Sequence, residues 1–271
     1  MTENIPRRII QTSGSVSLPL LAKAAATNLR LLNPNFEYLF FDDSAVERFI
    51  DAEFPQYRSV FNSFSIRIQR YDLFRYLAVY RFGGFYFDTD FFLASGLETL
   101  LEFSCVFPFE HLSIYSFLDK QHGMDWEIGN YAFGAAAGHP FLEAIIKNCV
   151  RAQEHPEWAE PMVKSIPRIF RDEYAILATT GPGLVSRTLA EFPDACSKVK
   201  VLFPEDVCDS KSWFHFGNYG VHLQIGSWRK PKSFVRRLLH RIWESTTRKS
   251  LMKKSRKRGG KRLLKFKSSM M

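Results

Sequence analysis

The sequence contains few cysteines and no long hydrophobic run. Its 271 residues include four cysteines, with no CxxC pair and no zinc-like spacing: Cys105, Cys149, Cys196 and Cys208. This pattern argues against a zinc site or a disulfide framework and favours scattered reduced thiols. No segment reaches the roughly 18–20 uninterrupted apolar residues of a membrane span. The N-terminal "VSLPLLA" stops at Lys23 and makes a poor signal peptide. We therefore expect a cytoplasmic protein.

Charge divides the chain into two unequal parts. The sequence is 46% hydrophobic and 15% aromatic, which excludes a fully disordered protein and suffices for one large domain. Residues 1–228 carry 20 basic and 27 acidic side chains, whereas residues 229–271 carry 17 basic side chains and one acid. We predict a domain over residues 1–229, followed by a basic amphipathic helix and tail over residues 230–271.

Strand-like and helical segments alternate in the first part of the chain. β-Prone, aromatic segments are predicted at residues 5–12, 36–43 and 85–92, and helices at residues 18–32, 45–50 and 66–82. Gly83-Gly84 should end the last of these helices. The alternation predicts a mainly parallel α/β sheet whose ligands collect at the carboxyl ends of its strands. Further strands are expected at residues 104–110 and 199–207, and a Gly/Ala-rich strand or turn at residues 130–138. A helix is expected at residues 139–153 and a loop leading into a helix at residues 179–192, and residues 220–228 close the acidic body.

Two acids interrupt the apolar run "GGFYFDTDFF". A buried carboxylate needs a partner or a metal. On a single strand Asp88 and Asp90 would point to the same face, where they would suit Mn²⁺ or Mg²⁺ with positions left open for phosphate oxygens. An exposed turn carrying two acids is the alternative for a bare DxD, but the aromatic flanks favour the metal site.

One helix upstream, Asp72 and Arg75 are three residues apart and share a helical face. Taken alone they predict an intrahelical salt bridge worth a few tenths of a kcal/mol. Next to the Gly-Gly pair and the DxD, a second interpretation opens. The carboxylate would accept from a ribose or base, and the guanidinium would grip a phosphate.

These residues resemble a known signature. "RYDLFRYLAVYRFGGFYFDTD" is similar to that of the DXD-containing sugar transferases of glycosyltransferase family 32, which includes the yeast outer-chain and inositol-phosphoceramide mannosyltransferases and is related to the glucosylating clostridial toxins. The pattern is met by Asp72, Arg75-Tyr76, Gly83-Gly84, Tyr86, Asp88 and Asp90. "IPRRIIQT", "NPNFEYLFFDD", "NYAFGAAAGHPFLEAII", "TGPG" and "HLQIGSW" resemble further family segments, although Ile10 replaces a His that many relatives carry before the Gln.

The resemblance implies a GT-A fold, a Rossmann-like nucleotide-sugar-binding α/β architecture with a mixed, mostly parallel sheet flanked by helices. It implies a retaining reaction, a UDP- or GDP-hexose donor and Mn²⁺ or Mg²⁺. The metal ligands would be Asp88, Asp90 and His222. The implied catalytic residues are Asp72, Arg75, Asp88, Asp90 and Asn130, and the implied donor-binding residues are Gln11, Asp72, Arg75, Tyr86, Asp88 and Trp228.

Three of these residues also suit ordinary structural positions when each is taken by itself. His222 suits a hydrogen-bonded core or surface histidine. Asn130 suits a turn, and Trp228 suits a core or interface position. Only the order of the motifs favours the functional roles.

The basic C-terminal segment predicts one amphipathic helix. Its apolar residues form a single helical stripe, with arginines on the other sides: Phe234, Val235, Leu238, Leu239, Ile242 and Trp243. Such a helix followed by a Lys/Arg cluster favours contact with an anionic membrane surface. The alternatives are a helix docked on the body with a solvated tail, or nucleic-acid binding, which the acidic body disfavours.

We therefore predict a metal-dependent hexosyltransferase. It would move a sugar from a nucleotide-sugar to a saccharide or lipid-linked acceptor, and would be peripheral on the inner face of a membrane. One alternative is a non-catalytic membrane- or nucleic-acid-binding protein with a structural DxD. Another is a metal-dependent phosphoester hydrolase, which would need a further cluster of carboxylates or histidines for a second metal.

Overall fold

The computed structural model describes residues 4–225 and 234–257. Its main sheet has the order β2-β1-β3-β7-β5-β6, and β8 also pairs with β5. The strands are β1 (Arg8–Thr12), β2 (Glu37–Phe41), β3 (Gly84–Phe87), β5 (Cys105–Leu112), β6 (Trp126–Ile128), β7 (Ala132–Ala135) and β8 (Lys200–Leu202). β7 and β6 run opposite to the other five strands. The predicted mixed, mostly parallel sheet is therefore confirmed.

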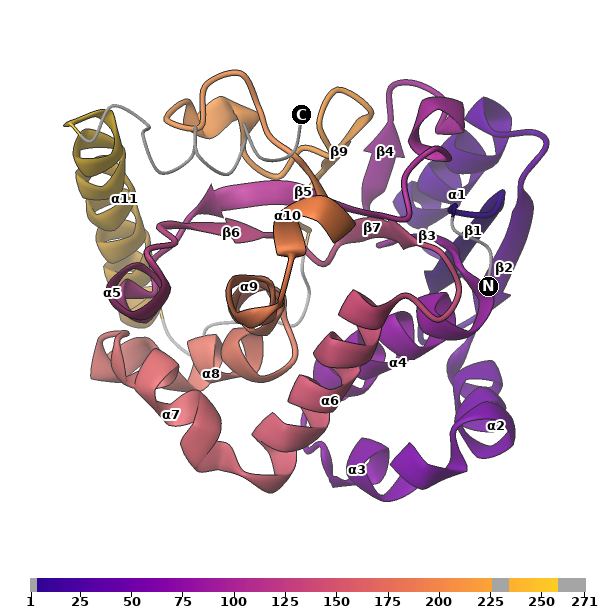
Figure 1. Ribbon diagram of the computed structural model, residues 1–271, viewed down its shortest axis with the longest axis horizontal. Coiled ribbons are helices and arrows are strands. Elements are labelled where there is room, and N and C mark those ends of the chain that lie inside the picture. Colours follow the sequence, from indigo (N-terminus) through magenta and orange to yellow (C-terminus); the bar gives the residue numbers. More distant parts are fainter. Residues whose placement is uncertain (1–3, 226–233, 258–271) are drawn as a thin grey trace.

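Helices cover both faces of this sheet. Figure 1 shows α4, α6 and α9 below it, α1 and a small second sheet above it, and α11 at one end. The helices are α1 (Leu20–Leu32), α2 (Asp43–Glu53), α3 (Arg58–Ser63), α4 (Arg67–Phe82), α5 (Ser116–His122), α6 (Pro140–Glu154), α7 (Pro156–Lys164), α8 (Arg171–Thr179), α9 (Pro182–Glu191), α10 (Ala195–Lys198) and α11 (Phe234–Lys257). Among them, α3, α5, α7, α8 and α10, like strand β6, were not predicted from the sequence.

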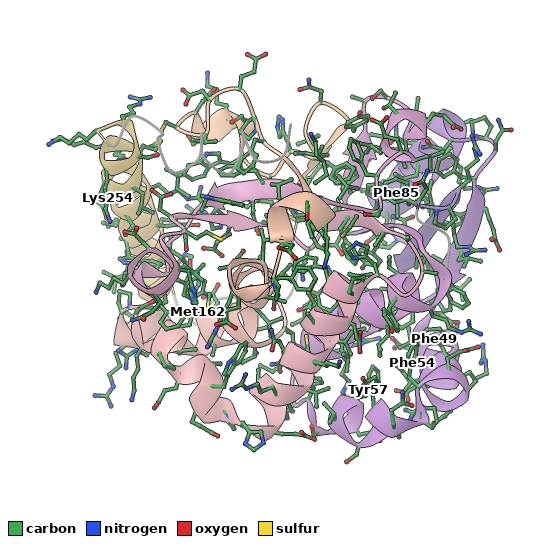
Figure 2. The ribbon with its side chains drawn as sticks, in the orientation of Figure 1. Phe49, Phe54, Tyr57, Phe85, Met162 and Lys254 are labelled. Carbon is green, nitrogen blue, oxygen red and sulfur yellow. The ribbon has the colours of Figure 1, made fainter. Side chains whose placement is uncertain are left out.

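Strand alternation feeds two hydrophobic cores. Ile10 and Tyr86 point into the larger core beneath the sheet, whereas Ile9 and Phe85 point into the core above it. Such alternation is what a two-residue period produces when both faces of a sheet are covered. In Figure 2, Phe49, Phe54 and Tyr57 gather at the α2–α3 corner, away from Phe85, and the Phe49 and Phe54 ring centroids are 5.6 Å apart.

The single strand expected over residues 85–92 is wrong. β3 ends at Phe87, and the chain turns through Asp88–Asp90, with the Phe91 amide donating to the Asp88 carbonyl at 3.1 Å. It then forms β4 (Phe91–Leu93), which pairs with β9 (Gly220–His222) in a separate two-stranded sheet. Aspartates disfavour strands and favour turns, so the acids lie at a junction between two sheets.

The glycine pair ends α4 as predicted. Gly83 has φ 65°, and its amide donates to the Val79 carbonyl at 2.8 Å. Gly84 has φ 107°, and a Cβ there would lie 2.7 Å from both Cβ and the carbonyl oxygen of Arg8. Only glycine fits such a conformation and such a close backbone approach. The pair therefore lets β3 start beside β1 directly after the helix.

The C-terminal helix packs on the body along part of its length. The Trp243 and Phe170 ring centroids are 4.8 Å apart, and Tyr174 Oη lies 3.1 Å from His240 Nε2. Leu238, Leu239 and Ile242 are 49%, 44% and 52% exposed. The predicted apolar stripe is therefore split between a docked side and an exposed side, and the side chains of Phe234 and Val235 lie outside the described residues.

Two expectations about membrane spans and cysteines can be compared with the described residues. No helix in the described ranges combines the length and hydropathy needed to cross a bilayer. Cys105, Cys149 and Cys208 are free and buried, while the side chain of Cys196 is not described.

His139 begins α6 and should make the fold sensitive to acid. Its Nδ1 accepts from the Phe141 amide at 3.2 Å, so protonation would break this cap. Burial lowers the pKa of His139 from 6.5 to about 4. The unfolded chain therefore binds the proton more readily, and stability is lost as the pH falls from about 6.5 towards 4. We expect a loss of up to about 3 kcal/mol in the free energy of unfolding over that range.

The matched variant is His139→Asn, which keeps a capping side chain without titrating in this range. Urea unfolding of both proteins at intervals between pH 7 and pH 4 measures the difference. Parallel pH profiles for the two proteins would show that His139 does not carry the effect.

Candidate active site

A cavity of about 540 Å³ opens at the carboxyl ends of β1 and β3. This is where ligands collect in open α/β sheets. The turn after β3, the loop after β1, the start of α1, one side of α4 and residues next to β9 line it: Thr12, Ser13, Gly14, Pro19, Leu21, Ala22, Arg67, Ile68, Tyr71, Arg75, Tyr86, Asp88, Thr89, Asp90, His222 and Ile225. The lining therefore includes five predicted site residues: Arg75, Tyr86, Asp88, Asp90 and His222.

Asp88, Asp90 and His222 converge on one wall of this cavity. One ligand atom from each lies within 4.8 Å of the other two. His222 Nε2 is 3.1 Å from Asp90 Oδ1 and 3.9 Å from Asp88 Oδ2. Register explains the convergence, because β4 pairs antiparallel with β9 and puts Phe91 opposite His222. The turn thus gathers the two acids, although not through the strand alternation we expected.

The surroundings fix the orientation of Asp90 and His222. Burial opposes ionisation of Asp90, but hydrogen bonds from His222 and from the Ile225 amide outweigh it and hold the pKa of Asp90 below its usual value. The Ile225 amide donates to Asp90 Oδ2 at 2.8 Å. The His222 ring stacks on Tyr131, with centroids 4.5 Å apart and planes 15° apart. His222 Nδ1 is buried and has no hydrogen-bond partner among the described residues.

Arg75 is a buried cation between two carboxylates. Its Nη2 lies 3.1 Å from Asp72 Oδ1, and its Nη1 lies 3.2 Å from Asp88 Oδ1. The guanidinium also sits over the Tyr86 ring, 4.7 Å from its centroid, and the Tyr86 hydroxyl donates to Asp88 Oδ1 at 2.9 Å. Burial by itself lowers the pKa of Arg75. The negative charges around it, chiefly that of Asp88, outweigh burial and raise the pKa above its usual value, so the side chain stays cationic. Arg75 Nε is buried without a partner among the described residues.

Asp72 lies beneath this cation, and both of its carboxylate oxygens accept hydrogen bonds. The Asn130 amide donates to Oδ1 at 3.0 Å, and the Thr180 hydroxyl donates to Oδ2 at 2.9 Å. Burial raises the pKa of Asp72 to about 6, against the opposing effect of Arg75. The Tyr76 hydroxyl donates to the Thr180 carbonyl at 2.7 Å and accepts from Asn130 at 2.8 Å. The pair predicted on one helical face is therefore part of a buried network.

Sequence reasoning missed Tyr76 and Thr180 as parts of this network. The signal for Thr180 was the "TGPG" segment, which we matched to a family loop without assigning it a role. Tyr76 stood in the motif beside Arg75 without a role of its own. Both residues are buried.

Four predicted site residues lie beside the cavity or outside the described residues. Asp72 and Asn130 lie behind Arg75, away from the lining residues, so their contacts with a donor stay predictions. Gln11 is buried under the turn, where its Nε2 donates to the Asp88 carbonyl at 3.2 Å and its Oε1 accepts from the Tyr38 hydroxyl at 2.7 Å. Trp228 lies outside the described residues.

Known proteins share both this motif region and this fold. Residues 21–107 match the family model described as "Glycosyltransferase sugar-binding region containing DXD motif". The predicted resemblance is confirmed. The chain is 29% identical to "Inositol phosphoceramide mannosyltransferase 3" of Schizosaccharomyces pombe over 147 residues, covering 54% of this chain and 38% of the relative. It is 26% identical to "Inositol phosphoceramide mannosyltransferase 2" of the same yeast over 220 residues, covering 78% and 56%.

A solved structure supports the fold assignment. "PaToxG Glycosyltransferase" superposes with a TM-score of 0.51 and 15% identity over 72% of each chain. The predicted GT-A fold is thereby confirmed. The aligned segments span about half of the curated mannosyltransferases or less.

Proposed function

We propose that this protein is a retaining, metal-dependent glycosyltransferase that moves a hexose, such as mannose, from a UDP- or GDP-linked donor to a glycolipid or saccharide acceptor. One observation carries the proposal. Asp88, Asp90, His222 and the buried cation Arg75 converge on one cavity, and all of them except His222 lie within the matched glycosyltransferase DXD region. The names of the yeast relatives point to mannose and to an inositol-phosphoceramide type of acceptor.

The ligand set fits a divalent cation. Two carboxylates and one imidazole offer atoms within 4.8 Å of one another, and oxygen-rich sets with open positions suit Mn²⁺ or Mg²⁺. Asp88, Asp90 and His222 would hold the ion. When bound, it would supply positive charge for the diphosphate of the donor.

The protein's own residues provide the rest of the chemistry. As the bond from the anomeric carbon to the β-phosphate oxygen breaks, its electron pair stays on that oxygen, and negative charge grows there. Arg75 is held cationic in a buried setting, where a preorganised charge stabilises such an oxygen more than water does. Asp72 and Asn130 fix the guanidinium from behind. The Tyr86 hydroxyl fixes Asp88 on the cavity side.

We also propose that the enzyme works at the cytoplasmic face of a membrane. The exposed apolar side of α11, formed by Leu238, Leu239 and Ile242, supports this together with the basic residues around it. A helix of this kind binds at the interface of an anionic bilayer.

The test is release of nucleoside diphosphate with Mn²⁺ across a panel of UDP- and GDP-hexoses, followed by transfer to inositol phosphorylceramide in detergent. We expect release from one donor and incorporation of its sugar into the lipid with retained anomeric configuration. Silence across the panel, with no donor-induced thermal stabilisation, would instead favour the non-catalytic binding protein.

A further inference from the structure

Helix α1 exposes leucines to an unusual degree. Leu20 and Leu31 are 86% and 74% exposed, and Leu32 is 37% exposed. Only Ala22, Ala25 and Leu29 of this 13-residue helix are buried. A surface that presents several large aliphatic side chains along one helix marks an interaction site.

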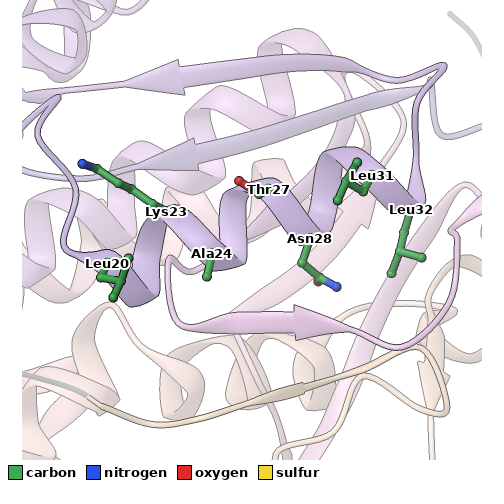
Figure 3. A pocket seen from close by; sticks show the side chains of 7 residues that line it. All are labelled: Leu20, Lys23, Ala24, Thr27, Asn28, Leu31 and Leu32. Carbon is green, nitrogen blue, oxygen red and sulfur yellow. The ribbon is translucent and has the colours of Figure 1, made fainter.

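The exposed side of α1 is a shallow apolar groove of about 540 Å³. Figure 3 looks onto this side of the helix, where Leu20, Ala24, Asn28 and Leu32 form one row and Lys23, Thr27 and Leu31 form the next. Four-residue spacing aligns each row on one helical face. The groove is therefore a continuous strip along the whole helix.

Charge indicates what this strip contacts. Helix α1 contains two cations, Lys23 and Arg30, and no acid, whereas the preceding Arg7 and Arg8 are paired with Glu98 and Glu37. Lys23 is exposed and forms no ion pair within residues 4–225 and 234–257. Arg30 is also exposed, with its guanidinium over the Tyr38 ring. A helix surface that carries leucines and cations but no acid complements an anionic lipid surface.

The helix is fixed beside the candidate active site. Asn28 Nδ2 donates to the Leu93 carbonyl at 3.1 Å, and the Leu93 amide donates to Asn28 Oδ1 at 2.7 Å. Leu93 is on β4, the strand that follows Asp90. The start of the same helix, with Leu21 and Ala22, lines the active-site cavity. An α-helix is about 10–12 Å across, so a surface that contacts the outer side of α1 lies one helix width from that cavity.

We infer that α1 is a lipid-docking helix, which lays Leu20 and Leu31 into the headgroup–acyl boundary of an anionic bilayer and pairs Lys23 and Arg30 with its phosphates. This inference deepens the proposed function and rests on it, because a lipid-docking helix beside the cavity serves catalysis only if that cavity is the active site. The docked helix presents the cavity to acceptor headgroups in the same bilayer. It is distinct from the exposed side of α11, which lies at the far end of the sheet in Figure 1.

Co-sedimentation of the full chain with phosphatidylcholine vesicles, with and without phosphatidylserine, tests the docking. The variant is Leu20→Ser/Leu31→Ser. A comparison variant, Leu239→Ser/Ile242→Ser, removes two exposed aliphatic side chains from α11, the other surface proposed to contact the membrane. We expect the α1 variant to bind anionic vesicles about tenfold or more weakly than the wild type. Lys23→Gln should weaken binding to anionic vesicles and leave binding to neutral ones unchanged. All of the substituted residues are exposed, and thermal melts are the check that each variant folds.

The readouts separate this inference from the proposed function. Nucleoside diphosphate release in solution should be the same in the α1 variant and the wild type, whereas transfer to a vesicle-borne acceptor should fall. Wild-type binding by the α1 variant, with binding lost only in the α11 variant, would overturn the role of α1. Concentration-dependent dimerisation without vesicles, abolished in the α1 variant, would assign the groove to a second copy and also overturn it. Absence of activity from every donor would refute the proposed function alone, since vesicle binding is measured independently.

Discussion

Asp90→Asn should reduce Mn²⁺-dependent release of nucleoside diphosphate by about 10³-fold or more. The change removes the negative charge of one candidate metal ligand. It therefore weakens binding of the cation whose positive charge would stabilise the departing diphosphate. It should leave the fold intact, because an asparagine oxygen can still accept from the Ile225 amide. Release assays and thermal melts with and without Mn²⁺ measure the two effects.

The melts provide evidence that does not depend on activity. Mn²⁺ at about 100 times its Kd should stabilise the wild type by about 2.7 kcal/mol, and this stabilisation should be lost in the variant. The control is Asp51→Asn, which makes the same chemical change at a carboxylate that is 67% exposed and paired with Arg58. Full activity and an unchanged Mn²⁺ response in Asp90→Asn would exclude the metal site as described.

Arg75→Met should destabilise the fold as well as inactivate the site. It leaves two carboxylates, one of them fully buried, without the cation between them, and breaking such a buried pair costs about 3–5 kcal/mol. The pKa of Asp72, already raised to about 6 by burial, should rise further once the cation is lost. Urea unfolding at pH 7 measures the loss. Arg67→Met is the control on the same helix, since that side chain is 60% exposed and should cost less than about 1 kcal/mol.

A double-mutant cycle shows whether the cost comes from the Arg75–Asp72 pair. Asp72→Asn removes the buried charge and keeps an oxygen for Asn130 or Thr180. The double variant should therefore be more stable than the sum of the two single losses predicts, with a coupling of about 1–3 kcal/mol. Additive losses would mean that Arg75 stabilises the fold mainly through its other contacts, with Asp88, Tyr86 and the Asn130 carbonyl.

The first half of the fold was accessible from sequence because its signals are local. Alternating apolar segments, Gly83-Gly84 and the predicted helix at residues 66–82 all correspond to observed elements. Local signals failed at Asp88–Asp90, where aromatic residues on both sides suggested one continuous strand. Pairing of β4 with β9, far along the chain, decides instead that the strand breaks there. Such long-range pairing has no local signature.

The candidate site was predictable to a similar extent. The motif named Asp72, Arg75, Asp88 and Asp90 through their residue types and order, but not the direction of each side chain. Asp72 faces inward because Thr180 and Asn130 provide its hydrogen bonds, and Thr180 is 108 positions away in the sequence. Neither spacing nor composition specifies which distant residue satisfies a buried carboxylate.

The long separation between Asp90 and His222 has a consequence for biosynthesis. The two side chains meet across 132 positions of sequence, through the pairing of β4 with β9. A chain growing from the ribosome presents β1, β2, β3 and its DxD turn well before residue 222 emerges, and until then it lacks the third candidate ligand. Domains fold as units during synthesis, so metal affinity should appear late, as one of the last properties that the nascent chain acquires. Under the proposed function, unfinished chains would therefore not act on a nucleotide-sugar donor.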